Sequence, residues 1–265
     1  MRAGPAHIVA MTRDPRDLLE LFGADRGIVC AIGAGGKKST LYRIAEAHDG
    51  PWALTATVFT TTFPEMLNLT AVVQDADSLA GAVLAAAAKH RRLGYARPSD
   101  KPGRYAGVDP DLIREIHHQA GLALTLVKAD GARMRWLKAP KEGEPVLPAG
   151  CTTVIPVLSA RALGEPLSPR TAHRPERVAA VAGVHEGDIV TPAHLARLLI
   201  ADAGLLQGVG DQQVVPVINM VDDDAREALA RQAAIAALEQ SDRFDRVVLA
   251  CMRRAGNPVV AVVGR

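Results

Sequence analysis

The segment that most constrains the fold is a continuous apolar run over 27–32, which leads directly into Gly33-Ala-Gly-Gly-Lys-Lys-Ser-Thr40. A short apolar run without polar alternation is typical of a strand that is buried on both faces of a parallel sheet. A helical pattern then extends from about Ser39 to Ala47. The segment therefore predicts a strand, a tight glycine-rich turn and a helix, as in α/β proteins.

The remaining chain alternates strand-like and helix-like segments. This pattern predicts an α/β fold with a mostly parallel sheet flanked by helices, similar to the fold of P-loop NTPases. Further strands are predicted over 52–58, 71–73, 91–96, 122–127, 152–158, 214–218, 246–250 and 259–263. Further helices are predicted over 14–22, 77–90, 109–120, 175–181, 192–203 and 223–239, with loops over 98–107 and 134–150. We expect one domain over 1–265, with or without a smaller lobe over about 140–210.

Composition and charge argue against several classes of function. The chain has 31 Lys and Arg against 29 Asp and Glu, and its formal net charge of +2 provides no broad field for nucleic acid. Its 2 Trp, 3 Tyr and 4 Phe are few for a surface that stacks bases. No apolar run reaches the roughly 18 residues that span a bilayer, and the N-terminus lacks the apolar core of a signal peptide. We therefore expect a cytoplasmic protein without a nucleic-acid or membrane partner.

The glycine-rich turn is predicted to bind phosphate. Glycines at 33, 35 and 36 allow backbone N–H groups to face an anion, Lys37 adds a positive charge, and the helix adds its N-terminal dipole. The full phosphate-loop signature is G-x-x-x-x-G-K-[ST]. Here Ala31 stands at the first glycine position and Lys38 at the Ser/Thr position. The predicted nucleotide-binding residues of this turn are Gly33, Ala34, Gly35, Gly36, Lys37, Lys38, Ser39 and Thr40.

Two other interpretations of the turn are less favoured. A dinucleotide fingerprint, G-x-G-x-x-G, would need glycine where Lys38 stands, and the strand over 52–58 ends without an acid for a ribose. A glycine-rich turn without a ligand would leave Lys37 and Lys38 repelling each other at a helix start. Phosphate binding is therefore the favoured interpretation.

Asp130 follows the buried strand over 122–127 and precedes Gly131. An acid at the carboxyl end of a strand beside a phosphate loop commonly holds Mg²⁺, although Asp-Gly is also a turn dipeptide. We expect Asp130 to bind Mg²⁺ together with the hydroxyl of Ser39 or Thr40. Lys37 and Asp130 are then the predicted catalytic residues for electrostatic positioning of a phosphoryl group of ATP or GTP.

The segment Asn219-Met-Val-Asp222 follows the apolar strand over 214–218. An asparagine and an aspartate at this spacing can hydrogen-bond a purine base, but Met220 stands where N-K-x-D motifs have a lysine. The acidic run over 222–224 is also a good helix start. Base recognition by Asn219 and Asp222 and capping of the following helix are both open.

Six short motifs spread along the chain together carry a resemblance to a known family. They lie at 33–37, 60–62, 129–133, 137–140 with 144–148, 173–176 and 219–222. Through them the chain, from about Ala24 to Cys251, resembles the YqeC family of accessory proteins linked to selenium-dependent molybdenum hydroxylases. The family usually has Thr, Glu and Lys where this chain has Lys38, Lys128 and Met220.

The resemblance implies a role in supplying a selenium-containing molybdenum cofactor to a hydroxylase. With the predicted nucleotide and Mg²⁺ site, we expect the hydrolysis or binding of ATP or GTP to support maturation or insertion of this cofactor. The implied partners are the nucleotide, the molybdenum cofactor or a selenium species, and the hydroxylase or its other accessory proteins. The alternatives are a non-hydrolysing cofactor-binding chaperone and an ATP-dependent ligase-like enzyme. The departures at 38 and 220 leave the choice of base and the hydrolysis of the nucleotide open.

The proline-rich loop over 134–150 and the segment around 173 contribute polar residues that we expect to face the substrate. They are Arg133, Lys138, Glu144, His173 and Arg174. Arg133 and Lys138 are suited to a phosphate, a pyranopterin phosphate or a selenium oxyanion because both are cations. His173 is predicted either to transfer protons or to anchor the loop, and any single Lys or Arg can equally be a solvated surface residue.

Overall fold

The computed structural model describes residues 7–8 and 15–265. The helices are α1 (Pro15–Phe22), α2 (Lys37–Ala47), α3 (Ala76–Ala87), α4 (Pro110–Gln119), α5 (Pro175–Ala182), α6 (Pro192–Ile200) and α7 (Asp224–Gln240). The longer strands are β2 (Gly27–Gly33), β3 (Trp52–Ala56), β5 (Thr70–Val73), β6 (Arg92–Ala96), β8 (Leu124–Lys128), β10 (Cys151–Ser159), β13 (Val217–Asn219), β14 (Arg246–Ala250) and β15 (Val259–Gly264). The short elements are β1 (His7–Ile8), β4 (Thr60–Thr61), β7 (Arg104–Tyr105), β9 (Leu137–Lys138), β11 (Ala172–His173), β12 (Gln213–Val214) and the 3₁₀ turns η1 (Glu65–Leu67) and η2 (Ala160–Ala162).

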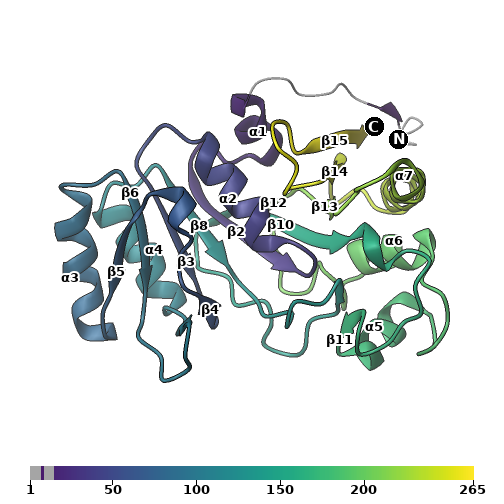
Figure 1. Ribbon diagram of the computed structural model, residues 1–265, viewed down its shortest axis with the longest axis horizontal. Helices are drawn as coiled ribbons and strands as arrows, with labels where there is room; N and C mark the ends of the chain where they lie inside the picture. The colour runs from purple at the N-terminus through teal and green to yellow at the C-terminus, as the bar shows by residue number, and fades with distance from the viewer. Residues whose placement is uncertain (1–6, 9–14) are drawn as a thin grey trace.

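One large sheet runs through the molecule in the order β1-β15-β14-β13-β10-β2-β8-β3-β6-β5, with β12 beside β10 (Figure 1). The pairs from β14 across the sheet to β5 are parallel, whereas β15 and β1 at the other edge pair antiparallel. The predicted α/β fold with a mostly parallel sheet flanked by helices is therefore confirmed. The pairing places Gly33 of β2 beside Val157 of β10, and Ala31 beside Lys128 of β8.

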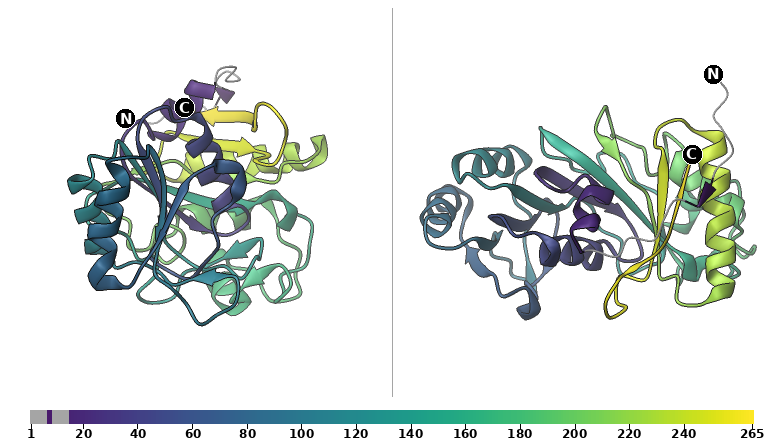
Figure 2. Two further views of the ribbon diagram at one scale, coloured as in Figure 1. Left: turned by 60° about the vertical axis from the view of Figure 1, so that its left-hand side comes forward. Right: turned by 90° about the horizontal axis from the view of Figure 1, so that it is seen from above.

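Helices cover both faces of the sheet. Because successive residues of a strand point to opposite sides, a central strand contributes side chains to the apolar clusters on both faces. Val29 and Ala31 of β2 lie in one apolar cluster with α1 and α2, whereas Ile28, Cys30 and Ile32 lie in another with α3 and α4. Seen from above, α3 lies at one end of the molecule and α7 at the other (Figure 2). The apolar run predicted to form a doubly buried strand is thus doubly buried.

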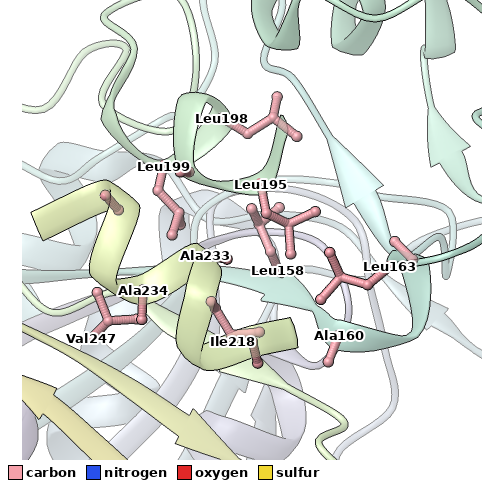
Figure 3. Packing of buried hydrophobic residues seen from close by; sticks show 14 of the residues in the cluster. Leu158, Ala160, Leu163, Leu195, Leu198, Leu199, Ile218, Ala233, Ala234 and Val247 are labelled. Atoms are coloured by element: carbon pink, nitrogen blue, oxygen red, sulfur yellow. The ribbon is translucent and has the colours of Figure 1, made fainter. Parts of the chain in front are cut away.

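A third apolar cluster joins α5, α6 and α7 to the sheet. Leu195 and Leu199 of α6 and Ala233 of α7 lie over Leu158 of β10 and Ile218 of β13 (Figure 3). Small side chains on α7 allow this close approach, since its buried residues are mostly alanines. The segment over 140–210, which the sequence singles out as a candidate lobe, therefore shares its apolar core with the strands of the main sheet.

Several element boundaries differ from the predictions for local physical reasons. Helix α2 begins at Lys37 and not at Ser39. The strand predicted over 214–218 is divided into β12 and β13 around Pro216, which has no N–H to donate to a ladder. The loops predicted over 98–107 and 134–150 contain the two-residue strands β7 and β9. The predicted start of the first helix at Asp14 lies outside the described residues.

Among the residues that the structure describes, no helix is both long enough and apolar enough to cross a bilayer.

Candidate functional site

The glycine-rich turn lies where the strand connections of the sheet diverge. Strand β2 continues through α2 to β3 on the β8 side, whereas the adjacent strand β10 continues through α5 and α6 towards β13 on the opposite side. In open α/β sheets, ligands bind outside the carboxyl ends of the strands at such a switch point. The turn over 33–36 occupies this place between β2 and α2 (Figure 1).

The turn is pressed against the ends of β10 and β13, and its glycines make this possible. Gly36 has φ 136°, and a Cβ atom there would lie 1.9 Å from Nδ2 of Asn219. A Cβ atom on Gly35 would lie 2.5 Å from Cβ of Ser159. A side chain at either position would therefore collide with a neighbouring strand end.

Most backbone N–H groups of the turn already have protein acceptors. Gly33 donates to Oδ2 of Asp130 at 2.9 Å, Ala34 to the carbonyl of Val157 at 2.7 Å, and Gly35 to the carbonyl of Arg135 at 3.1 Å. The first N–H groups of a helix have no acceptor within the helix, and no side chain caps α2 at Gly36. The first turn of α2 is therefore the part of this segment that offers N–H donors to an anion.

Lys37 and Lys138 both pair with Asp130 below this turn. Nζ of Lys37 lies 2.9 Å from Oδ1 of Asp130 and also donates to the carbonyl of Gly33. Nζ of Lys138 lies 2.8 Å from Oδ2. Lys37, Lys138 and Asp130 are 6%, 0% and 2% exposed, so the cluster is almost free of solvent. Burial lowers the pKa of Lys37, and the carboxylate of Asp130 opposes this effect.

The ion-pair network extends from Lys138 to the segment before α5. Nζ of Lys138 lies 2.7 Å from Oε2 of Glu144, and Arg174 makes two hydrogen bonds of 2.9 and 3.1 Å to the same carboxylate. Burial alone would raise the pKa of Glu144, but the hydrogen bonds from Arg174 and Lys138 lower it to about 2. Three of the predicted substrate residues, Lys138, Glu144 and Arg174, are thus connected through Asp130 to Lys37.

Sequence comparison identifies the family of the chain. The family model described as YqeC protein matches residues 29–176, more than half of the chain. The chain belongs to the YqeC family. It is similar to an uncharacterised protein YqeC of Escherichia coli (strain K12), with 28% identity over 200 residues that cover 74% of this chain and 77% of the relative. The part that matches the YqeC model contains the glycine turn, Asp130 and Glu144 but ends before Asn219.

Two further lysines, Lys38 and Lys128, lie in and near α2. Nζ of Lys38 donates to Oγ1 of Thr61 at 2.8 Å, and Nζ of Lys128 donates to the carbonyl of Phe59 at 2.9 Å. Burial, and after it the positive charge of Lys37, lowers the pKa of Lys128 to about 7. The two lysines and the threonine pair of β4 line one small cavity beside α2. The threonine motif is therefore placed next to the lysine that replaces the usual hydroxyl.

The hydroxyl groups predicted to bind Mg²⁺ lie in the first turns of α2. Thr40 is buried, and its Oγ1 donates to the carbonyl of Gly36 at 3.2 Å. Ser39 is half-buried. The side chain of Thr40 is therefore directed along the helix to the backbone of the turn.

Asn219 connects the glycine turn to the end of the sheet. Its Nδ2 donates to the carbonyl of Gly35 at 2.8 Å, and its Oδ1 accepts from the N–H of Met252 at 3.0 Å. Asp222 accepts hydrogen bonds from Arg161 at 2.8 and 2.6 Å. The polar groups of Asn219 are therefore engaged with backbone, and recognition of a base by this motif stays a prediction.

The cap of α7 is one residue further along the chain. Oδ1 of Asp223 accepts from the N–H of Arg226 at 2.8 Å, so Asp223 is the N-cap. The capping role predicted for the acidic run is confirmed at its second residue.

The remaining predicted substrate residues border the ion-pair network. Burial and the nearby charges of Arg174 and Lys138 lower the pKa of His173 to about 4. Arg133 is exposed and has φ 46°. The sequence reasoning missed the contacts that Ser159 and the Arg135 carbonyl make with the turn. Ser159 ends the strand β10, which is adjacent to β2, and this position could have indicated its contact with the glycine turn.

Proposed function

We propose that this protein binds a nucleoside triphosphate, ATP or GTP, through its phosphate chain at the first turn of α2. The observation that carries the proposal is the buried pair of Lys37 and Asp130 below a helix N-terminus that no side chain caps. A helix N-terminus with a lysine at its first position is a favourable environment for phosphate.

The charges of the buried network support an anionic ligand. Lys37, Lys138 and Arg174 contribute three positive charges, and Asp130 and Glu144 contribute two negative charges. Arg174 is 21% exposed, so the excess positive charge lies where the network reaches the surface and is open to an anion. A phosphate oxygen at Lys37 would add a negative charge to the network, while Asp130 would keep its contacts with Lys138 and the N–H of Gly33.

The chemistry available to such a site is electrostatic. Phosphoryl transfer depends on the positioning of the phosphate chain and on the stabilisation of its developing charge. Lys37 would contact the β- and γ-phosphates, and Asp130 would hold the Lys37 ammonium in place before the nucleotide binds. A ligase-like reaction that activates an acid with ATP uses the same binding step, and the products would separate it from simple hydrolysis.

A non-hydrolysing binding protein is a second candidate, because of one specific contact. Lys38 stands at the Ser/Thr position of the phosphate-loop signature, and its ammonium is hydrogen-bonded to Thr61. The hydroxyl that contributes to turnover in phosphate-loop enzymes is thus replaced by a cation. Binding without release of phosphate would follow.

We further propose that the nucleotide supports maturation or insertion of a selenium-containing molybdenum cofactor in a hydroxylase. This role is supported by the resemblance to the YqeC family that the sequence motifs carry. Arg133 and His173, which border the buried network, would then face the molybdenum cofactor or the selenium species.

The proposed function is tested by calorimetric titration of the full chain with ATP and with GTP, in Mg²⁺ and in EDTA. Lys37→Met keeps the length of the side chain but removes its charge, and Lys89→Met removes an exposed charge at the end of α3 as the matched control. We expect Lys37→Met to weaken binding by about tenfold or more, and Lys89→Met to leave it unchanged. Equal affinities of the two variants would overturn the proposal. Release of phosphate by the wild-type protein then decides between turnover and binding alone.

A further inference from the structure

The predicted Mg²⁺ site can be tested against the donors that the structure provides. Mg²⁺ requires oxygen ligands in near-octahedral geometry, and phosphate-loop proteins supply a Ser/Thr hydroxyl and an acidic residue. Asp130 is the predicted acid. Its Oδ2 accepts from the N–H of Gly33 and from Lys138, and its Oδ1 is paired with Lys37. Oδ2 is therefore held by two donors, whereas Oδ1 has the ion pair with Lys37 and no hydrogen bond.

The hydroxyl side of the predicted metal site is reduced to one residue. Lys38 replaces the hydroxyl that would contact the metal, Oγ1 of Thr40 is turned to the carbonyl of Gly36, and the half-buried Ser39 is the one predicted hydroxyl left. In the part of the chain that the structure describes, there is no group of three or more His, Cys, Asp or Glu side chains that could hold a metal ion. The donor set around α2 thus offers Mg²⁺ one hydroxyl, that of Ser39, and one carboxylate that is already paired with two lysines.

The same positions are occupied by nitrogen donors that suit phosphate directly. Lys37 lies at the first position of α2, and Lys38 lies beside it with its ammonium 2.8 Å from the hydroxyl of Thr61. Lys128 places another amine on the cavity that Lys38 and Thr61 line. Ammonium groups next to phosphate oxygens neutralise the charge that a bound metal otherwise neutralises.

We propose that this site binds the triphosphate chain as the free anion, with the ammonium group of Lys38 taking the place of Mg²⁺. This inference rests on the proposed function, since it concerns the form of the nucleotide that the same site accepts. It identifies the ligand class as a nucleoside triphosphate without a bound divalent cation. Excess Mg²⁺ binds the free nucleotide and therefore competes with the protein for it.

The first experiment compares the affinity for ATP in EDTA with the affinity in saturating Mg²⁺, by calorimetry on the full wild-type chain. We expect affinity in EDTA to be higher than affinity in Mg²⁺. Equal affinities, or higher affinity in Mg²⁺, would overturn this inference and leave the proposed function intact. Absence of binding in both buffers would overturn the proposed function, and this inference with it. Inorganic tripolyphosphate in EDTA serves as a second probe, and its failure to compete with ATP would overturn the assignment to the phosphate chain.

The second experiment tests the role assigned to Lys38. Lys38→Thr restores the hydroxyl of the complete signature, and Lys89→Thr makes the same change at an exposed site. We expect Lys38→Thr to lose about tenfold or more of its ATP affinity in EDTA and to regain affinity in Mg²⁺, while Lys89→Thr behaves as wild type. Lys38→Met, which keeps the apolar stem, guards against a folding defect and should show the same loss in EDTA. Wild-type affinity of both Lys38 variants in EDTA would overturn the inference.

Discussion

Asp130 and Lys138 form a buried ion pair in which Nζ of Lys138 lies 2.8 Å from Oδ2 of the carboxylate. The two residues are eight positions apart, and they belong to the loop that separates β8 from β10. Because Lys138 is fully buried, its ammonium depends on Asp130 and Glu144 for all of its compensating charge. This pair connects the glycine-rich turn with the segment before α5.

Removal of the Lys138 charge should destabilise the protein. In Lys138→Met, Asp130 and Glu144 would each lose a buried cationic partner, and breaking a buried pair in this way costs about 3 kcal/mol. We expect a loss of this size in the free energy of unfolding, measured by urea denaturation at neutral pH. Lys141→Met, at an exposed position of the same loop, is the control. A loss no larger than that of the control would show that the pair contributes little.

Asn219→Ala should weaken the binding of ATP and GTP to the same extent. The variant loses the hydrogen bonds to Gly35 and Met252 and leaves two buried backbone groups unpaired, at a cost of about 1–3 kcal/mol. Calorimetric titration with both nucleotides measures the ratio of their affinities, and Gln74→Ala is an exposed control. A change in the ATP-to-GTP ratio would instead indicate that Asn219 reads the base.

Gly36→Ala should be far more damaging than Gly103→Ala. Both glycines have positive φ, for which alanine is unfavourable by about 1 kcal/mol. A Cβ at Gly103 meets no atom within 4 Å, whereas at Gly36 it lies 1.9 Å from Asn219. We expect urea denaturation to show a loss for Gly36→Ala that exceeds the loss for Gly103→Ala by about 1–3 kcal/mol. Equal losses would mean that backbone conformation alone is responsible.

Acid should destabilise the protein through Glu144. Its folded pKa is about 2, so the folded state keeps the carboxylate ionised at pH values where the unfolded chain, with a pKa of about 4.3, binds a proton. The contribution is complete above the unfolded pKa and is lost as pH falls towards 2. Glu144→Gln should therefore be less stable at neutral pH and lose less further stability on acidification, in urea denaturation at a series of pH values. Glu142→Gln, at an exposed site, should keep the wild-type slope.

Most elements of the fold could be predicted from local sequence patterns. The strand, turn and helix over 27–47 were predictable, with the helix start two residues late, because doubly buried strands are continuously apolar and glycines mark a tight turn. The N-cap of α4 was predictable because Asp109 precedes a proline, and its side chain accepts from Asp111 and Leu112. Each of these features is decided within a few neighbouring residues.

The buried ion network could not be predicted in the same way. Strands β9 and β11 have two residues each, which is too short to show an apolar alternation. Their paired residues, such as Leu137 and Ala172, are 35 positions apart in the sequence. A lysine in a proline-rich loop is normally at the surface, yet Lys138 is fully buried because β9 carries it under the sheet end. Such burial is decided by pairing between distant segments and leaves no local pattern.

The contact between Asn219 and Gly35 joins residues 184 positions apart. During translation, the whole segment that matches the family, up to residue 176, is therefore synthesised before Asn219, which contacts the glycine turn. The nascent chain can form β2 and α2 early, but the turn reaches its final conformation only after β13 has emerged. The Asn219 contact that holds Gly35 therefore forms only once the last quarter of the chain is being made.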